Sequence, residues 1–229
     1  MMEVSQSLSD LVRRWQLGEG LSRGFHPTSE ARGGLHVPLG QSDQQHEITA
    51  LYADDDLESV RLLAAEVANA QHLNWLAVPT THPEVVGPIL RGAGLDLRDQ
   101  ADWLMTCDLQ QHPLRVPTSQ YVCEIISEGP VIKAQVRHSS GVVAAKGSMV
   151  VVNTDAIADR IVTIPEHRRL GLGSVVMSVL VQQAIVHGAT TGILIASPDG
   201  QQLYPTLGWI YRATVYIGQT PNHAAQSRA

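Results

Sequence analysis

The segment from residue 161 to residue 176, IVTIPEHRRLGLGSVV, constrains the fold more than any other part of the chain. It begins as an apolar strand that ends at Pro165, and it continues into an apolar helix from about Ser174. The first turn of a helix has backbone N–H groups without intrahelical partners, and the helix dipole makes that end attractive to an anion. Gly171 and Gly173 lack side chains that would keep a phosphate away from this backbone. The segment therefore predicts an anion-binding loop.

Two well-known phosphate loops do not fit this segment. A dinucleotide-binding GxGxxG fingerprint fails because Val176 stands where the third glycine is needed, and the chain contains no GK[ST] triplet of a P-loop. The pattern present is Arg168-x-x-Gly171-x-Gly173. It resembles the (Q/R)xxGx(G/A) acyl-CoA loop of the GNAT N-acetyltransferase superfamily.

The flanks of the loop strengthen this resemblance. The preceding strand ends with the apolar-x-Pro sequence of residues 163–165, and the following helix of about four turns stops at Gly188. A buried strand at 193–196 comes next. Residues 203–209, LYPTLGW, match an LYxxxGF signature with Trp in place of Phe. The resemblance covers about residues 121–217.

The resemblance implies an α/β (α+β) fold with a mixed, mostly antiparallel sheet flanked by helices, and acetyl-CoA as co-substrate. Loop amides would hold the CoA pyrophosphate, and the end of the preceding strand would pair with the pantetheine. That pairing requires the sheet to open between this strand and residues 193–196. The cofactor-binding residues implied are Val162, Thr163, Ile164, Arg168, Arg169, Leu170, Gly171, Leu172, Gly173 and Ser174.

For catalysis, the resemblance implies that Tyr204 is the general acid toward the departing CoA thiolate. The alternative is that Tyr204 only packs against the cofactor. Asp159 is the candidate base, or else it forms a structural ion pair with a nearby arginine. Strand alternation predicts that Asp159, Ile161 and Thr163 share a face. Arg160, on the opposite face, is either structural or a contact for a substrate carboxylate.

Other reactive side chains give weaker signals. His167 lies inside the loop and either contacts phosphate or is exposed to solvent. The histidines form no HExxH or His-Cys cluster, so no metal site is expected. Cys107 and Cys123 form no CxxC pair, and Cys123 is expected as a small core residue. No GxSxG motif supports hydrolase chemistry.

A proline-containing segment at 110–120, QQHPLRVPTSQ, predicts the boundary between two parts. We expect an N-terminal domain over 1–112, a catalytic domain over 118–218 and a loose tail over 219–229. The first part predicts strands at 33–38, 46–53, 75–78 and 101–109 and helices at 57–69 and 83–92. The second predicts a four-strand antiparallel meander over 121–164, then a helix, a strand, a short helix and a final strand.

The second part departs from the GNAT pattern because the two helices expected between its first two strands are missing. The N-terminal part could supply the missing cover and form an acceptor groove with it. Its layout over 75–109 resembles a degenerate GNAT half, with residues 78–83 in place of the phosphate loop, and the alternative is a cap of unrelated fold. The acids at 54–56 are expected as a solvated helix start.

Charge is unevenly distributed along the chain, whose net charge is −6. Residues 1–116 carry 16 acidic and 8 basic side chains, whereas residues 117–229 carry 6 and 8. An acidic protein is a poor candidate for general nucleic-acid binding. The balance suits an anionic cofactor on the second part. If the acidic first part lines the acceptor groove, it favours a cationic amine.

The expected activity is transfer of an acetyl group from acetyl-CoA to a primary amine of a small molecule. The alternatives are a protein or peptide acceptor, and a CoA-binding regulatory protein without turnover. No apolar run is long enough for a membrane span, and no secretory signal is visible at the N-terminus. A cytoplasmic monomer or homodimer is therefore expected, without a nucleic-acid or membrane partner.

Overall fold

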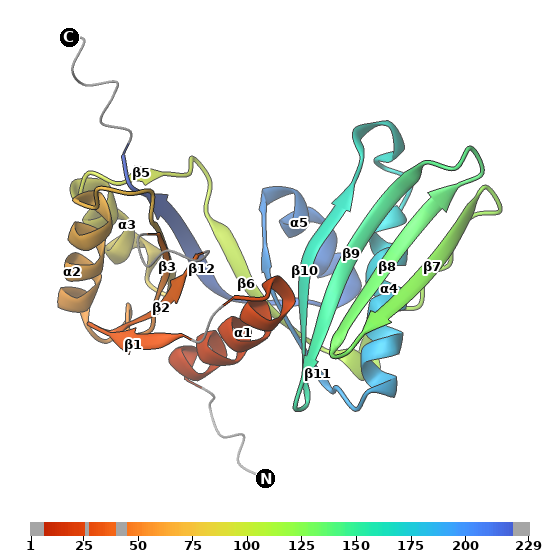
Figure 1. The fold of residues 1–229 in the computed structure, drawn as a ribbon, viewed down its shortest axis with the longest axis horizontal. Helices are drawn as coiled ribbons and strands as arrows, with labels where there is room; N and C mark the ends of the chain where they lie inside the picture. The colour runs from red at the N-terminus through yellow and green to blue at the C-terminus, as the bar shows by residue number, and fades with distance from the viewer. Residues whose placement is uncertain (1–6, 26–27, 40–44, 222–229) are drawn as a thin grey trace. The chain divides into compact units, whose positions relative to one another are not determined.

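The computed structural model describes residues 7–25, 28–39 and 45–221 of the 229-residue chain (Figure 1). No helix in these ranges is long and apolar enough to cross a membrane. The chain folds into two compact units that exchange short segments. The first unit comprises Met1–Arg13, Phe25–Leu104 and Arg212–Ala229, and the second comprises Arg14–Gly24 and Met105–Tyr211.

This division differs from the one predicted at residues 110–120. The change of unit falls at residues 104 and 105, inside strand β6 (Asp102–Asp108). Strand β12 (Ile210–Gln219) likewise begins in the second unit and continues in the first. Helix α1 (Leu8–Arg23) also runs through both. Composition could not show these exchanges, because each depends on pairing between segments far apart in the sequence.

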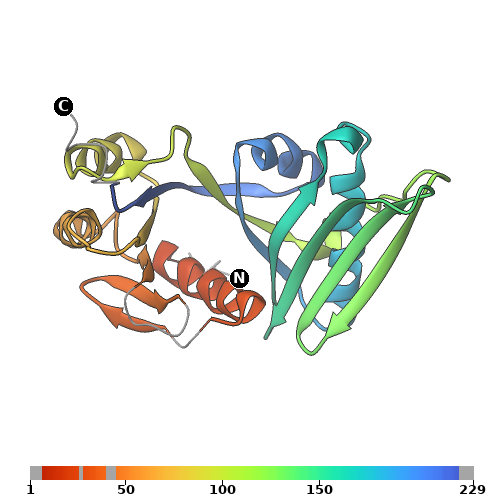
Figure 2. The ribbon, with the colours of Figure 1, turned by 45° about the horizontal axis from the view of Figure 1, so that its top comes forward.

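The first unit is a sheet with two helices, α2 and α3, packed together on it (Figure 2). Its strand order is β1-β2-β3-β4-β12, and β5 also pairs with β12. Only β3 and β4 are parallel to each other. The elements are β1 (Ser29–Ala31), β2 (Gly34–Pro38), β3 (His46–Ala50), α2 (Leu57–Ala68), β4 (Trp75–Thr80), α3 (Pro83–Gly92) and β5 (Asp96–Leu97).

The core of the first unit follows the predicted helical spacing. Val60, Leu63, Ala64 and Val67 of α2 are fully buried and pack against the strands. A side chain of the acidic segment 54–56 caps this helix, because Asp56 accepts hydrogen bonds from the second and third helical N–H groups. The acidic start is therefore part of the fold as well as of the surface.

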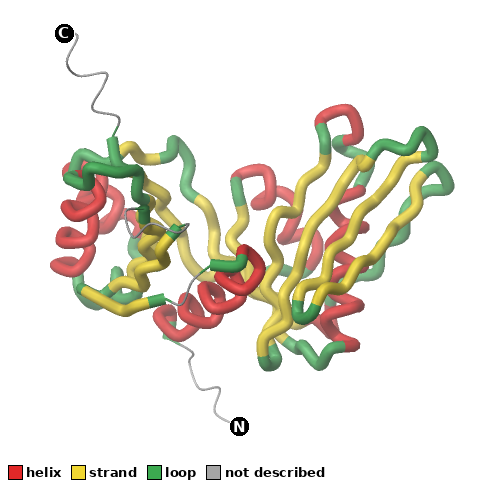
Figure 3. The backbone as a smooth tube through the Cα atoms, in the orientation of Figure 1, coloured by secondary structure: helices red, strands yellow, loops and turns green. Residues whose placement is uncertain are grey.

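The second unit contains the four-strand antiparallel meander that the sequence predicted (Figure 3). Its strand order is β6-β11-β10-β9-β8-β7, in which β10 and β11 are parallel. The elements are β7 (Tyr121–Glu128), β8 (Val131–His138), β9 (Val143–Val152), β10 (Asp155–Thr163), α4 (Leu172–Val186), β11 (Thr191–Ala196) and α5 (Pro198–Leu203).

Helix α4 is buried on more than one side. It packs on β8, β9 and β10, and Figure 1 shows it behind these strands. The chain after β6 covers another side, where the N–H of Arg115 donates to the hydroxyl of Ser178 at 2.9 Å. Ser178 is only 1% exposed, so this hydrogen bond explains a polar residue in an otherwise apolar helix.

The two units repeat one order of elements. Each has an antiparallel strand pair, a helix, a strand parallel to the pair's second member, another helix and a long final strand. Helix α2 after β3 thus corresponds to α4 after β10. The two units thus share one topology.

Helix α1, which the sequence analysis missed, lies along β10. Three contacts one helical turn apart meet alternate residues of the strand. Arg14 forms an ion pair with Asp155, Gly18 faces Ile157, and Ser22 donates to Asp159 at 3.3 Å. The helix covers the sheet face opposite α4.

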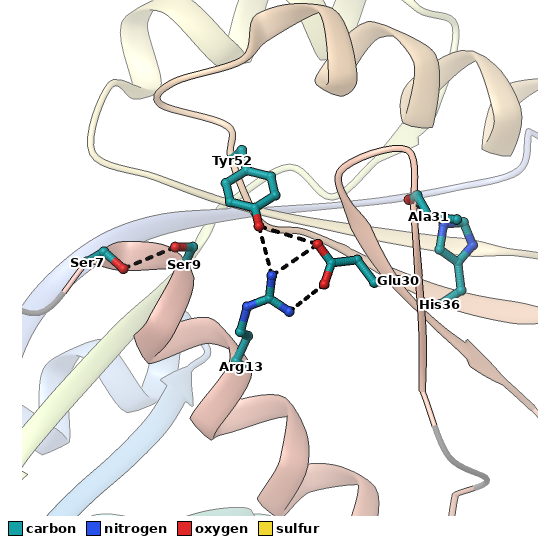
Figure 4. Close-up of polar contacts among 7 residues, drawn as sticks. All are labelled: Ser7, Ser9, Arg13, Glu30, Ala31, His36 and Tyr52. Atoms are coloured by element: carbon teal, nitrogen blue, oxygen red, sulfur yellow. Dashed lines mark hydrogen bonds and ion pairs between the residues drawn. The ribbon is translucent and has the colours of Figure 1, made fainter.

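The first turns of α1 belong to the first unit (Figure 4). Arg13 donates to both carboxylate oxygens of Glu30, at 2.7 and 3.0 Å, and to the hydroxyl of Tyr52 at 2.8 Å. These hydrogen bonds hold the pKa of Glu30 below its usual value. The signal for the helix was present in the sequence, since Leu8, Leu11, Val12 and Trp15 repeat at helical spacing.

The first residues of the predicted loose tail, 219 and 220, are part of the fold. Gln219 belongs to β12, and Thr220 is 8% exposed. The Thr220 hydroxyl donates to the carbonyl of Val67 and accepts from the N–H of Asn74, both at 3.0 Å. Residues 222–229 lie outside the described part of the chain.

The packing of α1 predicts opposite effects for two glycines of the same helix. A Cβ at Gly18 would lie 2.5 Å from Ile157, whereas a Cβ at Gly20 would meet no atom within 4 Å. Gly18→Ala should lower the free energy of unfolding by about 1–3 kcal/mol through overpacking. Gly20→Ala should raise it by about 0.5–1 kcal/mol through helix propensity. Urea unfolding measures both, and equal effects would contradict the contact.

Candidate functional site

The start of α4 is an open helix N-terminus. Gly171 is its N-cap, with φ 72° in the left-handed region, and no side chain caps the helix. Arg169 also has a positive φ, 62°. Two left-handed residues so close together turn the chain sharply from the strand into the helix. The first N–H groups of α4 are therefore left for another acceptor.

The glycines of the loop have different reasons to be glycine. A Cβ at Gly171 would meet nothing within 4 Å, so its requirement is conformational, and the space before the helix is free of described atoms. A Cβ at Gly173 would lie 3.1 Å from a methyl group of Leu203. Arg168, Arg169 and Leu170 are exposed beside this space. The loop thus presents backbone amides and positive charge to solvent.

Arg168 holds the loop in place as well as adding charge. Its Nε donates to the carbonyl of Thr163 at 3.3 Å. Its Nη1 lies 3.9 Å from Oδ2 of Asp199, the first acidic residue of α5. The guanidinium therefore ties the loop to the end of β10, which fixes the direction in which α4 begins.

The sheet opens beside this loop, as the sequence predicted. The parallel pairing of β10 with β11 joins Asp155, Ala156 and Ile157 to residues 191–193 and stops there. Strand β10 continues to Thr163 and β11 to Ala196. The edge of β10 that faces β11 is therefore unpaired over its last residues. Val162 in this stretch is 47% exposed.

A β-bulge corrects the predicted faces of β10. Asp159 pairs with Ser148 and Val162 pairs with Lys146, so β10 has one extra residue there, and Arg160 has φ 54°. An extra residue reverses the alternation of side chains beyond it. Asp159 and Val162 therefore share one face.

Beyond the bulge, Ile161 and Thr163 face α4. Ile161 packs over Gly147, and Thr163 Oγ1 lies 3.8 Å from the place of a Cβ at Gly173. The prediction that Asp159, Ile161 and Thr163 share a face was wrong. Alternation from the sequence alone could not detect the additional residue.

Asp159 lies in a group of charged side chains. Ser22 donates to its Oδ2 at 3.3 Å, Arg23 Nη2 lies 3.5 Å from its Oδ1, and Arg160 Nε lies 3.2 Å from its Oδ2. Arg23 also pairs with Glu19 at 2.6 Å. Ser22, Arg23 and Glu19 come from α1, so the sequence analysis missed them together with that helix. The sequence placed Arg160 on the face opposite Asp159, whereas in the structure the two side chains are in contact.

Tyr204 lies where the chain turns after α5, at the start of the 3₁₀ helix η3 (Tyr204–Leu207). It is 7% exposed, and its ring centroid is 5.9 Å from that of Trp209. A Cβ at Gly200 would lie 2.6 Å from the tyrosine ring, so Gly200 makes room for it. Burial and the negative charge of Asp159 raise the pKa of Tyr204 well above its usual value.

The rest of the predicted LYxxxGF-like signature explains this position. Gly208 ends the 3₁₀ helix with φ 83°, a left-handed conformation that suits glycine. Trp209 then packs over Gly192 of β11, where a Cβ would be 2.6 Å from the indole ring. The signature is thus a packing unit that fixes Tyr204 beside β11.

His167 is half-buried and contacts side chains of the neighbouring strands. Its Nδ1 is 2.7 Å from the hydroxyl of Tyr121, and its ring centroid is 5.2 Å from that of His138. These contacts anchor the start of the loop to β7 and β8. Cys123 is half-buried, and burial raises the pKa of its thiol.

The corresponding position in the first unit is closed to an anion. By topology it is the turn before α2, and not residues 78–83 as the sequence predicted. There the Asp56 carboxylate accepts from the N–H groups of Glu58 and Ser59, both at 3.1 Å. Its own negative charge occupies the place where a phosphate would bind.

The fold is similar to those of several solved protein structures. No protein-family model and no curated protein sequence matches the chain. A GCN5-related N-acetyltransferase from Kribbella flavida matches with a TM-score of 0.67 and 18% identity, covering 97% of this chain and 99% of that one. A tandem GNAT protein from the clavulanic acid biosynthesis pathway matches with a TM-score of 0.54 and 13% identity, covering 82% and 79%.

A GCN5-related N-acetyltransferase from Sphaerobacter thermophilus is also similar, with a TM-score of 0.56 and 10% identity, covering 82% of this chain and 76% of that one. The mixed, mostly antiparallel sheet with flanking helices agrees with these likenesses. The chain therefore has the fold of the GCN5-related N-acetyltransferases.

Proposed function

We propose that the chain is an acetyl-CoA-dependent N-acetyltransferase that transfers an acetyl group to the primary amine of a small molecule. One observation carries the proposal. The uncapped, glycine-rich start of α4 lies beside a stretch of β10 that β11 leaves unpaired. A diphosphate suits the first feature and an extended amide-containing chain suits the second. Acetyl-CoA combines both in one molecule.

In this proposal, the N–H groups from Gly171 to Ser174 bind the pyrophosphate, and Arg168 and Arg169 add positive charge. Val162, Thr163 and Ile164 offer backbone groups to the pantetheine amides along the open side of β10. Leu170 and Leu172 flank the loop, one exposed and one buried. In the first unit, the corresponding helix start is closed to a second cofactor, because Asp56 caps it.

Tyr204 is proposed as the general acid. When the amine nitrogen bonds to the acetyl carbon and the carbon–sulfur bond breaks, the leaving thiolate needs a proton. Tyr204 is buried, and like any tyrosine it is protonated at neutral pH; burial and Asp159 raise its pKa further. A neutral hydroxyl close to the sulfur can donate that proton as charge develops.

Asp159, the candidate base, is proposed here as a positioning residue. Arg23, Arg160 and Ser22 contact its carboxylate, which binds α1 to β10 and places negative charge near Tyr204. The other possibility, direct proton abstraction from the amine, differs in its pH profile. The pH dependence of the Asp159→Asn variant separates the two.

Two alternatives to the proposed function make different predictions. A protein or peptide acceptor predicts acetylation of peptides but not of free amines. A CoA-binding regulatory protein predicts tight CoA binding with no turnover on any amine. The buried, protonated Tyr204 favours turnover, since a binding protein has no use for a proton donor there.

The loop prediction compares a charged and a neutral residue of one shape. Asp and Asn both tolerate the left-handed conformation of Gly171. Gly171→Asp puts a carboxylate before α4, as Asp56 does before α2, and should weaken CoA binding at least tenfold relative to Gly171→Asn. Titration calorimetry measures the two affinities. Equal affinities would show that the phosphates bind elsewhere.

The acid prediction uses Tyr204→Phe, which keeps the ring and its contact with Trp209. We expect kcat to fall by about 10²-fold, because the proton donor is lost, and the Kd for CoA to remain unchanged. Steady-state kinetics with a panel of primary amines provides the measurement. An unchanged kcat would support the alternative that Tyr204 only packs.

The Asp159 prediction concerns the pH dependence of kcat/KM. Asp159→Asn keeps a side chain that can accept from Ser22, so it should lower kcat/KM by about tenfold and leave the acidic limb of the profile in place. A general base would contribute about 10²–10⁴-fold, and its removal would abolish that limb. Loss of the acidic limb in Asp159→Asn would therefore show that Asp159 is the general base.

A further inference from the structure

One face of the second unit's sheet remains available near the end of β10. Helix α4 covers the other face, where a Cβ at Gly147 of β9 would lie 3.0 Å from a methyl group of Val176. Ala145 and Met149, which share that face of β9, are buried. Strand alternation puts Lys146 and Ser148 on the face opposite α4.

The register shows what surrounds Lys146. It pairs directly with Gln135 of β8 on one side and with Val162 of β10 on the other. In the neighbouring row, Lys133 pairs with Ser148, and Ser148 pairs with Asp159. Lys146 is therefore the cation across from the open end of β10 and one row away from Asp159. Side chains in such adjacent pairs are within reach of one molecule.

The acidic side chains near Lys146 on this face are paired with arginines and not with Lys146. Asp159 is already contacted by Arg23 and Arg160, and Glu124 is contacted by Arg137. The side chain of Lys146 is exposed, and no hydrogen bond or ion pair joins it to another side chain in the described part of the chain. Among the side chains that the structure describes, no carboxylate contacts its ammonium group.

Both lysines of the chain lie on this face of the sheet. The chain has 14 arginines but only two lysines, Lys133 and Lys146, and the register places both on this face. Lysine presents a compact charge on a flexible stem, which suits a single carboxylate or phosphate oxygen. We infer that the acceptor amine also carries an anionic group, a carboxylate or a phosphate, which binds Lys146 on the sheet face opposite α4. This inference rests on the proposed function.

The inference reverses the expectation of a cationic acceptor. That expectation came from the acidic total of residues 1–116, which does not say which side chains face the site. On the face described here, the acidic side chains Asp159 and Glu124 already have arginine partners, and Lys146 has none among the described residues.

The test uses amines of matched length that differ in charge. The carboxylate arm compares 4-aminobutyrate with its neutral amide and with 1,4-diaminobutane. The phosphate arm compares phosphoethanolamine with ethanolamine. Each is measured by kcat/KM with acetyl-CoA and by calorimetric binding in the presence of CoA. The variants are Lys146→Gln and Lys146→Glu, with Arg61→Gln in the first unit as a matched loss of an exposed cation.

We expect the wild type to have a higher kcat/KM for the anionic amine than for the neutral amine in at least one of the two arms. The arm that shows this preference tells whether the anion is a carboxylate or a phosphate. Lys146→Gln should reduce that preference about three- to tenfold, and Lys146→Glu should reverse it. Arg61→Gln should leave the preference unchanged, and both Lys146 variants should keep their affinity for CoA. Equal kcat/KM values for anionic and neutral amines, or a preference that survives in Lys146→Glu, would overturn the inference.

The binding measurement separates this inference from the proposed function. Selective, Lys146-dependent binding of an anionic amine without turnover would uphold the inference and contradict the acetyltransferase proposal. Turnover of neutral amines with no charge preference would uphold the acetyltransferase proposal and contradict the inference about Lys146. Absence of binding by every anionic probe would overturn the inference regardless of turnover.

Discussion

The end of pairing between β10 and β11 is the constraint on which the rest of the site depends. After Ile157 and Ile193 the two strands no longer share hydrogen bonds, although both continue. The bulge at Arg160 turns the side chains of β10 over within the same stretch. Together they leave backbone groups of β10 available on one edge, send Ile161 and Thr163 toward α4 and keep Asp159 toward α1.

The comparison of the two units shows how one topology can have two outcomes. Each unit places a helix after the strand that precedes its parallel partner. In the first, the helix begins with Asp56, whose carboxylate satisfies the free N–H groups. In the second, it begins with Gly171, which satisfies none. A side chain of a few atoms thus decides whether a helix start is closed by the protein or open to a ligand.

Much of the fold could be predicted because local patterns were strong. The glycines and prolines around 161–188, and the alternation over 121–164, predicted the meander, the loop and α4 to within a few residues. The bulge and the exchanged strands β6 and β12 could not be predicted, since they depend on pairing between distant segments. Helix α1 was missed even though its apolar spacing is helical, and Glu19, Ser22 and Arg23 were missed with it. The positions of Tyr204 and Gly200 followed from a signature, but their mutual packing needed the structure.

The central claim is that the N–H groups at the start of α4 bind the CoA phosphates and that those at the start of α2 do not. Amide chemical shifts recorded by ¹⁵N NMR during a titration with CoA test it most directly. The account predicts large shifts for Gly171, Gly173 and Ser174 and none for Glu58 and Ser59, whose N–H groups donate to Asp56. Saturable shifts at Glu58 and Ser59, or an unchanged loop at Gly171, would contradict it.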